Sequence, residues 1–120
     1  MTLSSFERLA RRVMASLPPR FQLDNVEIVV QEVPTAEHLA EAGFGPDEGL
    51  LGLYVGTPLT QRGSAYQMTT PDIIYLFRRP IEAECSDHRD LWREVKRTLW
   101  HEVAHYYGIS DAELKAWGRG

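Results

Sequence analysis

The spacing of apolar residues predicts a long helix near each end of the chain. Apolar residues recur at three- and four-residue steps from about Ser4 to Ser16, and Pro18-Pro19 ends this first helix. The other helix is expected to begin at Asp87, which is a favourable N-cap residue. Its apolar residues form one stripe: Leu91, Trp92, Val95, Leu99, Val103 and Tyr106.

Apolar runs between these helices predict three β-strands: Val26 to Val33, Leu50 to Val55 and Ile73 to Phe77. The first run is nearly continuous, as in a strand that is covered on both faces. Gly52, in the second run, leaves space for the close approach of another backbone. The third strand is expected to end at Arg78-Arg79-Pro80. A short helix at Ala36 to Ala42 and a hairpin strand at Ala65 to Met68 complete the expected elements.

The segment His101-Glu102-Val103-Ala104-His105 lies on the last long helix. Residues four apart lie on one face of a helix, so His101 and His105 can direct imidazole nitrogens at the same zinc ion. Glu102 would lie beside the metal, where a carboxylate can take a proton from zinc-bound water. The alternative is a surface helix that carries these residues by chance. We interpret the segment as a zinc site with Glu102 as the catalytic base.

The residues that follow His105 indicate how a third ligand reaches the metal. Gly108 can adopt a positive φ and turn the chain back, which would bring Asp111 toward the metal. The segment Ser110-Asp111-Ala112-Glu113 is also typical of a capping box at the start of a short helix. These two interpretations are compatible in part, and we expect Asp111 to be the third ligand.

Other polar residues could belong to the same site. Glu94 and Thr98 precede the two histidines on one row of the helix, where either could orient a ligand. We interpret both as part of a solvated flank. His88 lies about three turns before His101 on the helix, too far to share its metal, and His38 is expected at the surface.

Length and composition restrict the class of protein. The 120 residues suit one domain, residues 1–120, and 43% hydrophobic with 25% charged residues is ordinary for a globular protein. The net charge of -4 argues against nonspecific nucleic-acid binding. A single cysteine, Cys85, excludes an internal disulfide and suits a reducing compartment. Because no signal-peptide or membrane-spanning pattern is present, we expect a cytoplasmic protein that does not enter a membrane.

Three segments resemble a known family: Gly49 to Leu59, Pro71 to Pro80 and His101 to Leu114. They are similar to small bacterial proteins described as minimal zincin-like metallopeptidases. The resemblance implies an α+β fold in which a small mixed sheet packs against an N-terminal helix and the active-site helix, with the metal site in a cleft. It also implies that the strand Leu50 to Val55 is the edge that pairs with an extended peptide or protein substrate.

The favoured function is a zinc-dependent peptidase, with His101, His105 and Asp111 as zinc ligands and Glu102 as the base. One alternative is a metal-dependent hydrolase of another class, acting on RNA or a small amide. Glu102 and the net negative charge count against it. Another alternative is a catalytically weak or inactive zincin-like binding module that recognises its partner through the edge strand.

Overall fold

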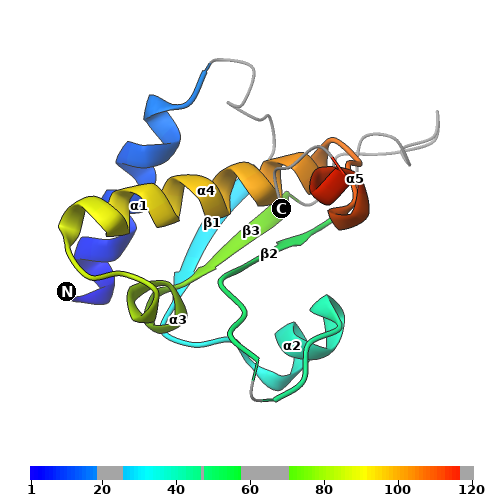
Figure 1. Ribbon diagram of the computed structural model, residues 1–120, viewed down its shortest axis with the longest axis horizontal. Helices are drawn as coiled ribbons and strands as arrows, with labels where there is room; N and C mark the ends of the chain where they lie inside the picture. The colour runs from blue at the N-terminus through cyan, green and yellow to red at the C-terminus, as the bar shows by residue number, and fades with distance from the viewer. Residues whose placement is uncertain (19–25, 47, 58–70, 117–120) are drawn as a thin grey trace.

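The computed structural model describes residues 1–18, 26–46, 48–57 and 71–116 (Figure 1). In chain order, the elements are α1 (Leu3–Ser16), β1 (Val26–Gln31), α2 (Ala36–Ala42), β2 (Gly52–Val55), β3 (Asp72–Phe77), α3 (Arg78–Ala83), α4 (His88–Tyr106) and α5 (Asp111–Ala116). The predicted hairpin strand at Ala65 to Met68 lies outside the described residues. Among those described, no helix combines the length and the apolar composition that crossing a bilayer requires.

Strand β3 is the middle of a three-stranded sheet with the order β1-β3-β2. It pairs in parallel with β1 and antiparallel with β2, so the sheet is mixed, as the family resemblance implied. Ile74, Leu76 and Phe77 of β3 have no exposed surface. This burial agrees with the continuous apolar sequence of a strand that has neighbours on both sides and cover on both faces.

Helices α1 and α4 pack together over one face of the sheet, where α4 crosses the strands (Figure 1). The apolar stripes of the two helices and the inward side chains of β3 form the main core: Phe6, Leu9, Val13, Ile74, Leu76, Leu91, Val95, Leu99 and Val103. Full burial of one such side chain contributes about 1.5–3 kcal/mol. This packing fixes which face of α4 is buried, and so which face is left for the histidines.

A smaller apolar cluster covers the other face of the sheet. Leu50, Leu53 and Phe77 form it, with Leu39 and Ala42 of α2 packed against them. In Figure 1, α2 lies on the side of the sheet away from α4. The sheet is therefore a middle layer, with helices on both faces, and the described chain has the α+β architecture that the sequence predicted.

The structure differs from the sequence prediction in several elements, and β2 begins at Gly52 instead of Leu50. β1 ends at Gln31 instead of Val33, and its side chains are half-buried or exposed, because it pairs only with β3 among the described strands. The expectation that both its faces are covered was wrong. β3 ends at Phe77, as predicted, but the residues that follow it begin α3, a helix that the sequence did not predict. Pro80 is the third residue of α3, where its missing N–H is not needed for the helix hydrogen bonds.

Candidate metal centre

Helix α4 carries two of the predicted ligands on one face. It begins at the predicted N-cap, because the Asp87 carboxylate accepts a hydrogen bond from the N–H of Asp90 at 2.8 Å. Near its other end, the rings of His101 and His105 have centroids 4.7 Å apart. Their side chains are 29% and 26% exposed, so both rings reach the surface while protein atoms hold them on other sides.

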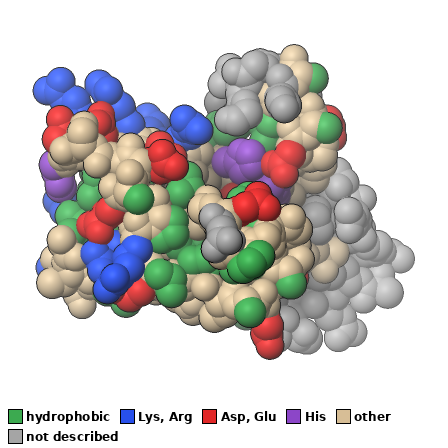
Figure 2. Space-filling model, turned by 60° about the horizontal axis from the view of Figure 1, so that its bottom comes forward, with side chains coloured by type: hydrophobic (Ala, Val, Ile, Leu, Met, Phe, Trp, Pro, Cys, Tyr) green, Lys and Arg blue, Asp and Glu red, His purple; other side chains and the backbone are tan. Residues whose placement is uncertain are grey.

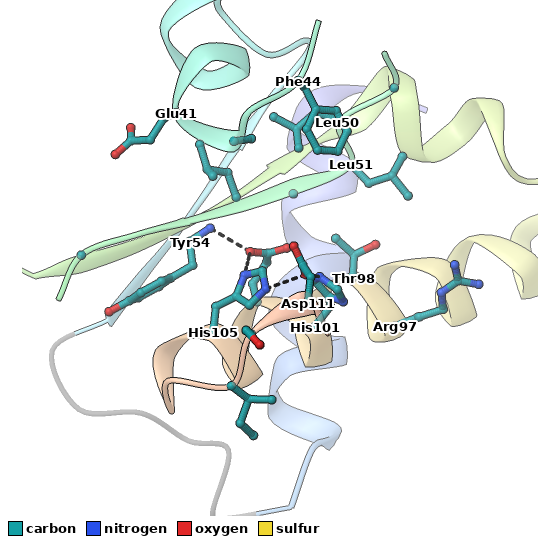
Figure 3. A pocket seen from close by; sticks show the side chains of 18 of the residues that line it. Glu41, Phe44, Leu50, Leu51, Tyr54, Arg97, Thr98, His101, His105 and Asp111 are labelled. Carbon is teal, nitrogen blue, oxygen red and sulfur yellow. Dashed lines mark hydrogen bonds and ion pairs between the residues drawn. The ribbon is translucent and has the colours of Figure 1, made fainter. Parts of the chain in front are cut away.

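A tight turn brings the third predicted ligand to these rings. Gly108 has a φ of 83°, as predicted, and its N–H donates to the carbonyl of His105. Beyond the turn, Asp111 Oδ1 lies 2.7 Å from His101 Nε2 and 2.9 Å from His105 Nε2 (Figure 3). Three atoms of the types that bind zinc therefore converge at one point.

Asp111 is at the same time the first residue of α5. Ser110 Oγ accepts a hydrogen bond from the N–H of Glu113 at 3.2 Å, and the N–H of Ser110 donates to Glu113 Oε1 at 3.3 Å. This is the predicted capping box. Burial raises the pKa of Asp111, but hydrogen bonds and charge from His105 and His101 outweigh it and hold the pKa below its usual value. The two interpretations of this segment coexist, because Ser110 and Glu113 cap the helix and leave the Asp111 carboxylate for the histidines.

Glu102 contacts the other ring nitrogen of His105. The Glu102 side chain is buried, and its Oε1 accepts a hydrogen bond from the N–H of Tyr54 at 2.9 Å and lies 3.2 Å from His105 Nδ1. A histidine whose Nδ1 is held by a carboxylate presents Nε2 to a metal. Since a carboxylate faces each ring nitrogen, the pKa of His105 is raised to about 9, and the hydrogen bond with Glu102 is the largest cause.

The donor atoms fit a zinc ion. The ligand-capable atoms of His101, Glu102 and His105 lie within 4.8 Å of one another, and Asp111 Oδ1 is within hydrogen-bond distance of both Nε2 atoms. Two imidazoles and one carboxylate are a donor set that catalytic zinc uses, with a fourth position kept open. Of the two carboxylates, Asp111 faces both Nε2 atoms, whereas Glu102 is engaged with Nδ1 of His105.

These residues open into a cleft of about 650 Å³ between β2 and α4. One wall comes from residues 49–54, and the opposite wall from α4 and residues 108–111. Figure 2 shows histidine side chains in a hollow of the surface with acidic side chains beside them. The cleft is thus bounded by a sheet edge and by the helix that carries the histidines.

The backbone of β2 comes unusually close to α4. A Cβ atom added at Gly52 would lie 2.7 Å from Thr98 Cγ2, 3.1 Å from the carbonyl oxygen of Tyr75 and 3.4 Å from Glu102 Cγ. Gly52 does permit a close approach, as predicted. Thr98 is buried beneath β2, so its assignment to a solvated flank was wrong, whereas Glu94 is half-buried and lines the cleft.

Two residues near the centre were missed from the sequence. Tyr54 contacts Glu102 through its backbone N–H, and the type of residue at a position does not predict a backbone contact of this kind. The Tyr54 hydroxyl donates to Asp72 Oδ2 at 2.6 Å, and Asp72 is only 4% exposed. An acidic residue at the start of an apolar strand was the one available signal for Asp72.

The remaining histidines and the cysteine lie away from the centre. His88 is exposed at the start of α4, whereas the half-buried His38 packs its ring 4.4 Å from that of Tyr75, on the α2 side of the sheet. Cys85 precedes α4 at the end opposite the metal centre. Its Sγ donates to the carbonyl of Ile81 at 3.2 Å, and burial raises the pKa of the thiol.

Comparison with known proteins gives a family match. The model of a family described as zincin-like metallopeptidase matches residues 23–119. Because the match covers most of the chain, the protein belongs to the zincin-like metallopeptidase family. A comparison with curated proteins gives no match. The family match assigns the general class, a zincin-like metallopeptidase.

Proposed function

We propose that this chain is a zinc-dependent peptidase. The proposal is based on the convergence of three atoms: His101 Nε2, His105 Nε2 and Asp111 Oδ1. They lie at the wall of a cleft that is also lined by the edge of a strand. When bound by these atoms, zinc would polarise a peptide carbonyl and lower the pKa of a water molecule toward about 7. The family membership supports the same class of reaction.

Glu102 is the proposed general base. Within the described part of the chain, hydrogen-bonding partners hold one of its two oxygens, because the N–H of Tyr54 and Nδ1 of His105 both lie against Oε1. No described residue makes a hydrogen bond to Oε2. That oxygen can therefore accept a proton from the attacking water and pass it to the leaving amine nitrogen.

The proposed substrate is an extended peptide that lies along β2. The carbonyl of Leu51 accepts a hydrogen bond from the N–H of Phe77, so Leu51 directs its backbone groups toward β3. In an antiparallel pair the direction alternates from one residue to the next. The backbone N–H and C=O groups of Gly52 and Tyr54 therefore point away from β3, to the outer edge of the sheet. The contact from the N–H of Tyr54 to Glu102 agrees with this direction. A substrate strand would add to the edge at Gly52, with its scissile bond beside the histidines.

A digest of a peptide library tests this function. The samples are the zinc-loaded wild type, the zinc-loaded Glu102→Gln variant and a chelated control, and cleavage sites are read by mass spectrometry. The variant keeps the shape of the side chain but cannot accept the proton, so it should bind zinc nearly normally and lose at least about 100-fold in rate. Glu94→Gln is the matched control, because Glu94 lines the same cleft from the same helix.

Cleavage by the wild type and by Glu94→Gln, but not by Glu102→Gln or the chelated sample, is the expected result. Equal cleavage by Glu102→Gln would reject the proposed base. If the wild type cleaves no peptide, the binding-module alternative replaces the peptidase.

A further inference from the structure

Tyr54 connects three parts of the molecule that do not adjoin in sequence. Its hydroxyl donates to the buried carboxylate of Asp72 at the start of β3. Its ring packs edge-on against the ring of Tyr106 of α4, with centroids 6.0 Å apart. Its N–H donates to Glu102. The position of this one residue therefore sets the distance between the sheet edge and the proposed base.

The local structure makes room for the contact between Tyr54 and Asp72. A Cβ atom added at Gly56 would lie 2.3 Å from Asp72 Cγ and 2.6 Å from its Oδ1, so the absence of a side chain at Gly56 accommodates the carboxylate. At the other end of β2, the absence of a side chain at Gly52 likewise makes room for Thr98 of α4. β2 is thus held closely at both of its ends, with Tyr54 between them.

We infer that Tyr54 and Asp72 are positioning residues that orient the carboxylate of Glu102. The bond from Tyr54 to Asp72 fixes the position of β2, so that the N–H of Tyr54 meets Oε1 of Glu102. Oε2 is then left without a hydrogen bond from any described residue. The catalytic part of this inference rests on the proposed function. Burial strengthens the argument, because a hydrogen bond to a charged carboxylate away from water is stronger than one between neutral groups.

Hydrogen exchange tests the geometry without any hydrolysis. The N–H of residue 54 faces away from the β-ladder, so its protection from exchange depends on Glu102. Tyr54→Phe removes only the hydroxyl and should raise the exchange rate of the residue 54 amide about tenfold, as the loss of one charged hydrogen bond would. Asp72→Asn keeps an acceptor of the same shape and should give a smaller increase.

Tyr75→Phe is the matched control, since Tyr75 lies on the neighbouring strand and packs on the other face of the sheet. It should leave the amide of residue 54 unchanged. Amides in the middle of α4 should keep their wild-type protection in all three variants. An unchanged residue 54 amide in Tyr54→Phe, or a uniform loss of protection across α4, would overturn the inference.

Kinetics of the zinc-loaded protein test the catalytic part. In Tyr54→Phe, kcat should fall about tenfold while KM and zinc content stay within about twofold, because the base is displaced but the cleft and the ligands remain. A normal kcat would overturn the catalytic role. If the wild type has no peptidase activity, the proposed function fails, while the exchange experiment still decides whether this pair orients Glu102.

Discussion

His105 is the residue at which the contacts of the candidate centre meet. Its Nδ1 lies against Glu102 and its Nε2 against Asp111, so the ring separates the two carboxylates into different surroundings. Asp111 is largely exposed and reaches both Nε2 atoms, whereas Glu102 is buried and bonded to the sheet edge. These different surroundings agree with the proposed roles of the two carboxylates, Asp111 as a metal ligand and Glu102 as the base.

Replacement of Asp111 by alanine should weaken zinc binding strongly. Loss of a partner outside the ligand set typically costs 10–100-fold in affinity, and we expect loss of the Asp111 carboxylate to cost at least about 100-fold. Glu113→Ala is the control, because it removes only the cap of α5 and should cost about 1 kcal/mol of stability. Competition with a chromogenic chelator measures both. Equal zinc affinity of the two variants would show that the third ligand lies elsewhere.

At the scale of elements, the site depends on the packing of β2 on α4. Glycine at position 52 lets a strand backbone lie where a side chain would normally separate sheet and helix. The result is that Glu102, which is on α4, can accept a hydrogen bond from a strand residue 48 positions earlier. A wider spacing would leave the carboxylate without that partner.

Gly52→Ala should destabilise the fold by about 1–3 kcal/mol, the usual cost of an added group in a closely packed position. Its Cβ would meet Thr98 Cγ2 at 2.7 Å. Thr98→Ser removes that methyl group, so the double variant should recover part of the loss, although the carbonyl of Tyr75 stays close. Chemical denaturation of the wild type, both single variants and the double variant gives the interaction energy. Strictly additive effects would argue against this contact.

At the scale of the whole molecule, one arginine joins the N-terminus to the end of β1 and to α3. Arg78 makes a two-bond contact with Glu32, at 2.5 Å and 2.6 Å, and also donates to Glu82 and to the carbonyl of Met1. The hydrogen bond from Arg78 is the largest cause that lowers the pKa of Glu32 from 4.5 to about 2. Side chains distant in sequence are tied together at the end of the sheet remote from the metal centre.

This cluster predicts how stability depends on pH. Because the pKa of Glu32 is lower in the folded chain, its contribution is present above pH 4.5 and is lost as the pH falls toward 2. Glu32→Gln should therefore unfold more easily than the wild type at pH 7, and the difference should shrink between pH 4.5 and 2. Thermal unfolding at several pH values measures it. Glu27→Gln, at an exposed position of β1, is the control and should show no such convergence.

The spacing of the residues along the chain predicted that His101, Glu102, His105 and Asp111 lie close together, and they do. Their roles at a metal stay predictions. Helical spacing alone puts two histidines four residues apart on one face, and a glycine with positive φ followed by a capping box determines the course of the chain to Asp111. These features depend on local backbone geometry. For the same reason, the N-cap of α4 and the apolar stripe of that helix could be predicted from the sequence.

The tertiary structure alone decided the contacts between distant segments. The partial exposure of β1 and the burial of Thr98 follow from the strand order β1-β3-β2 and from the face of the sheet that α4 covers. Nothing in an apolar run specifies whether its strand lies at the edge or in the middle of a sheet. The bonds that Tyr54 makes with Glu102 and Asp72 likewise require three separate elements to meet. Local spacing thus determined the proposed metal ligands, whereas packing determined what surrounds the base, because long-range contacts depend on how complete elements fit together.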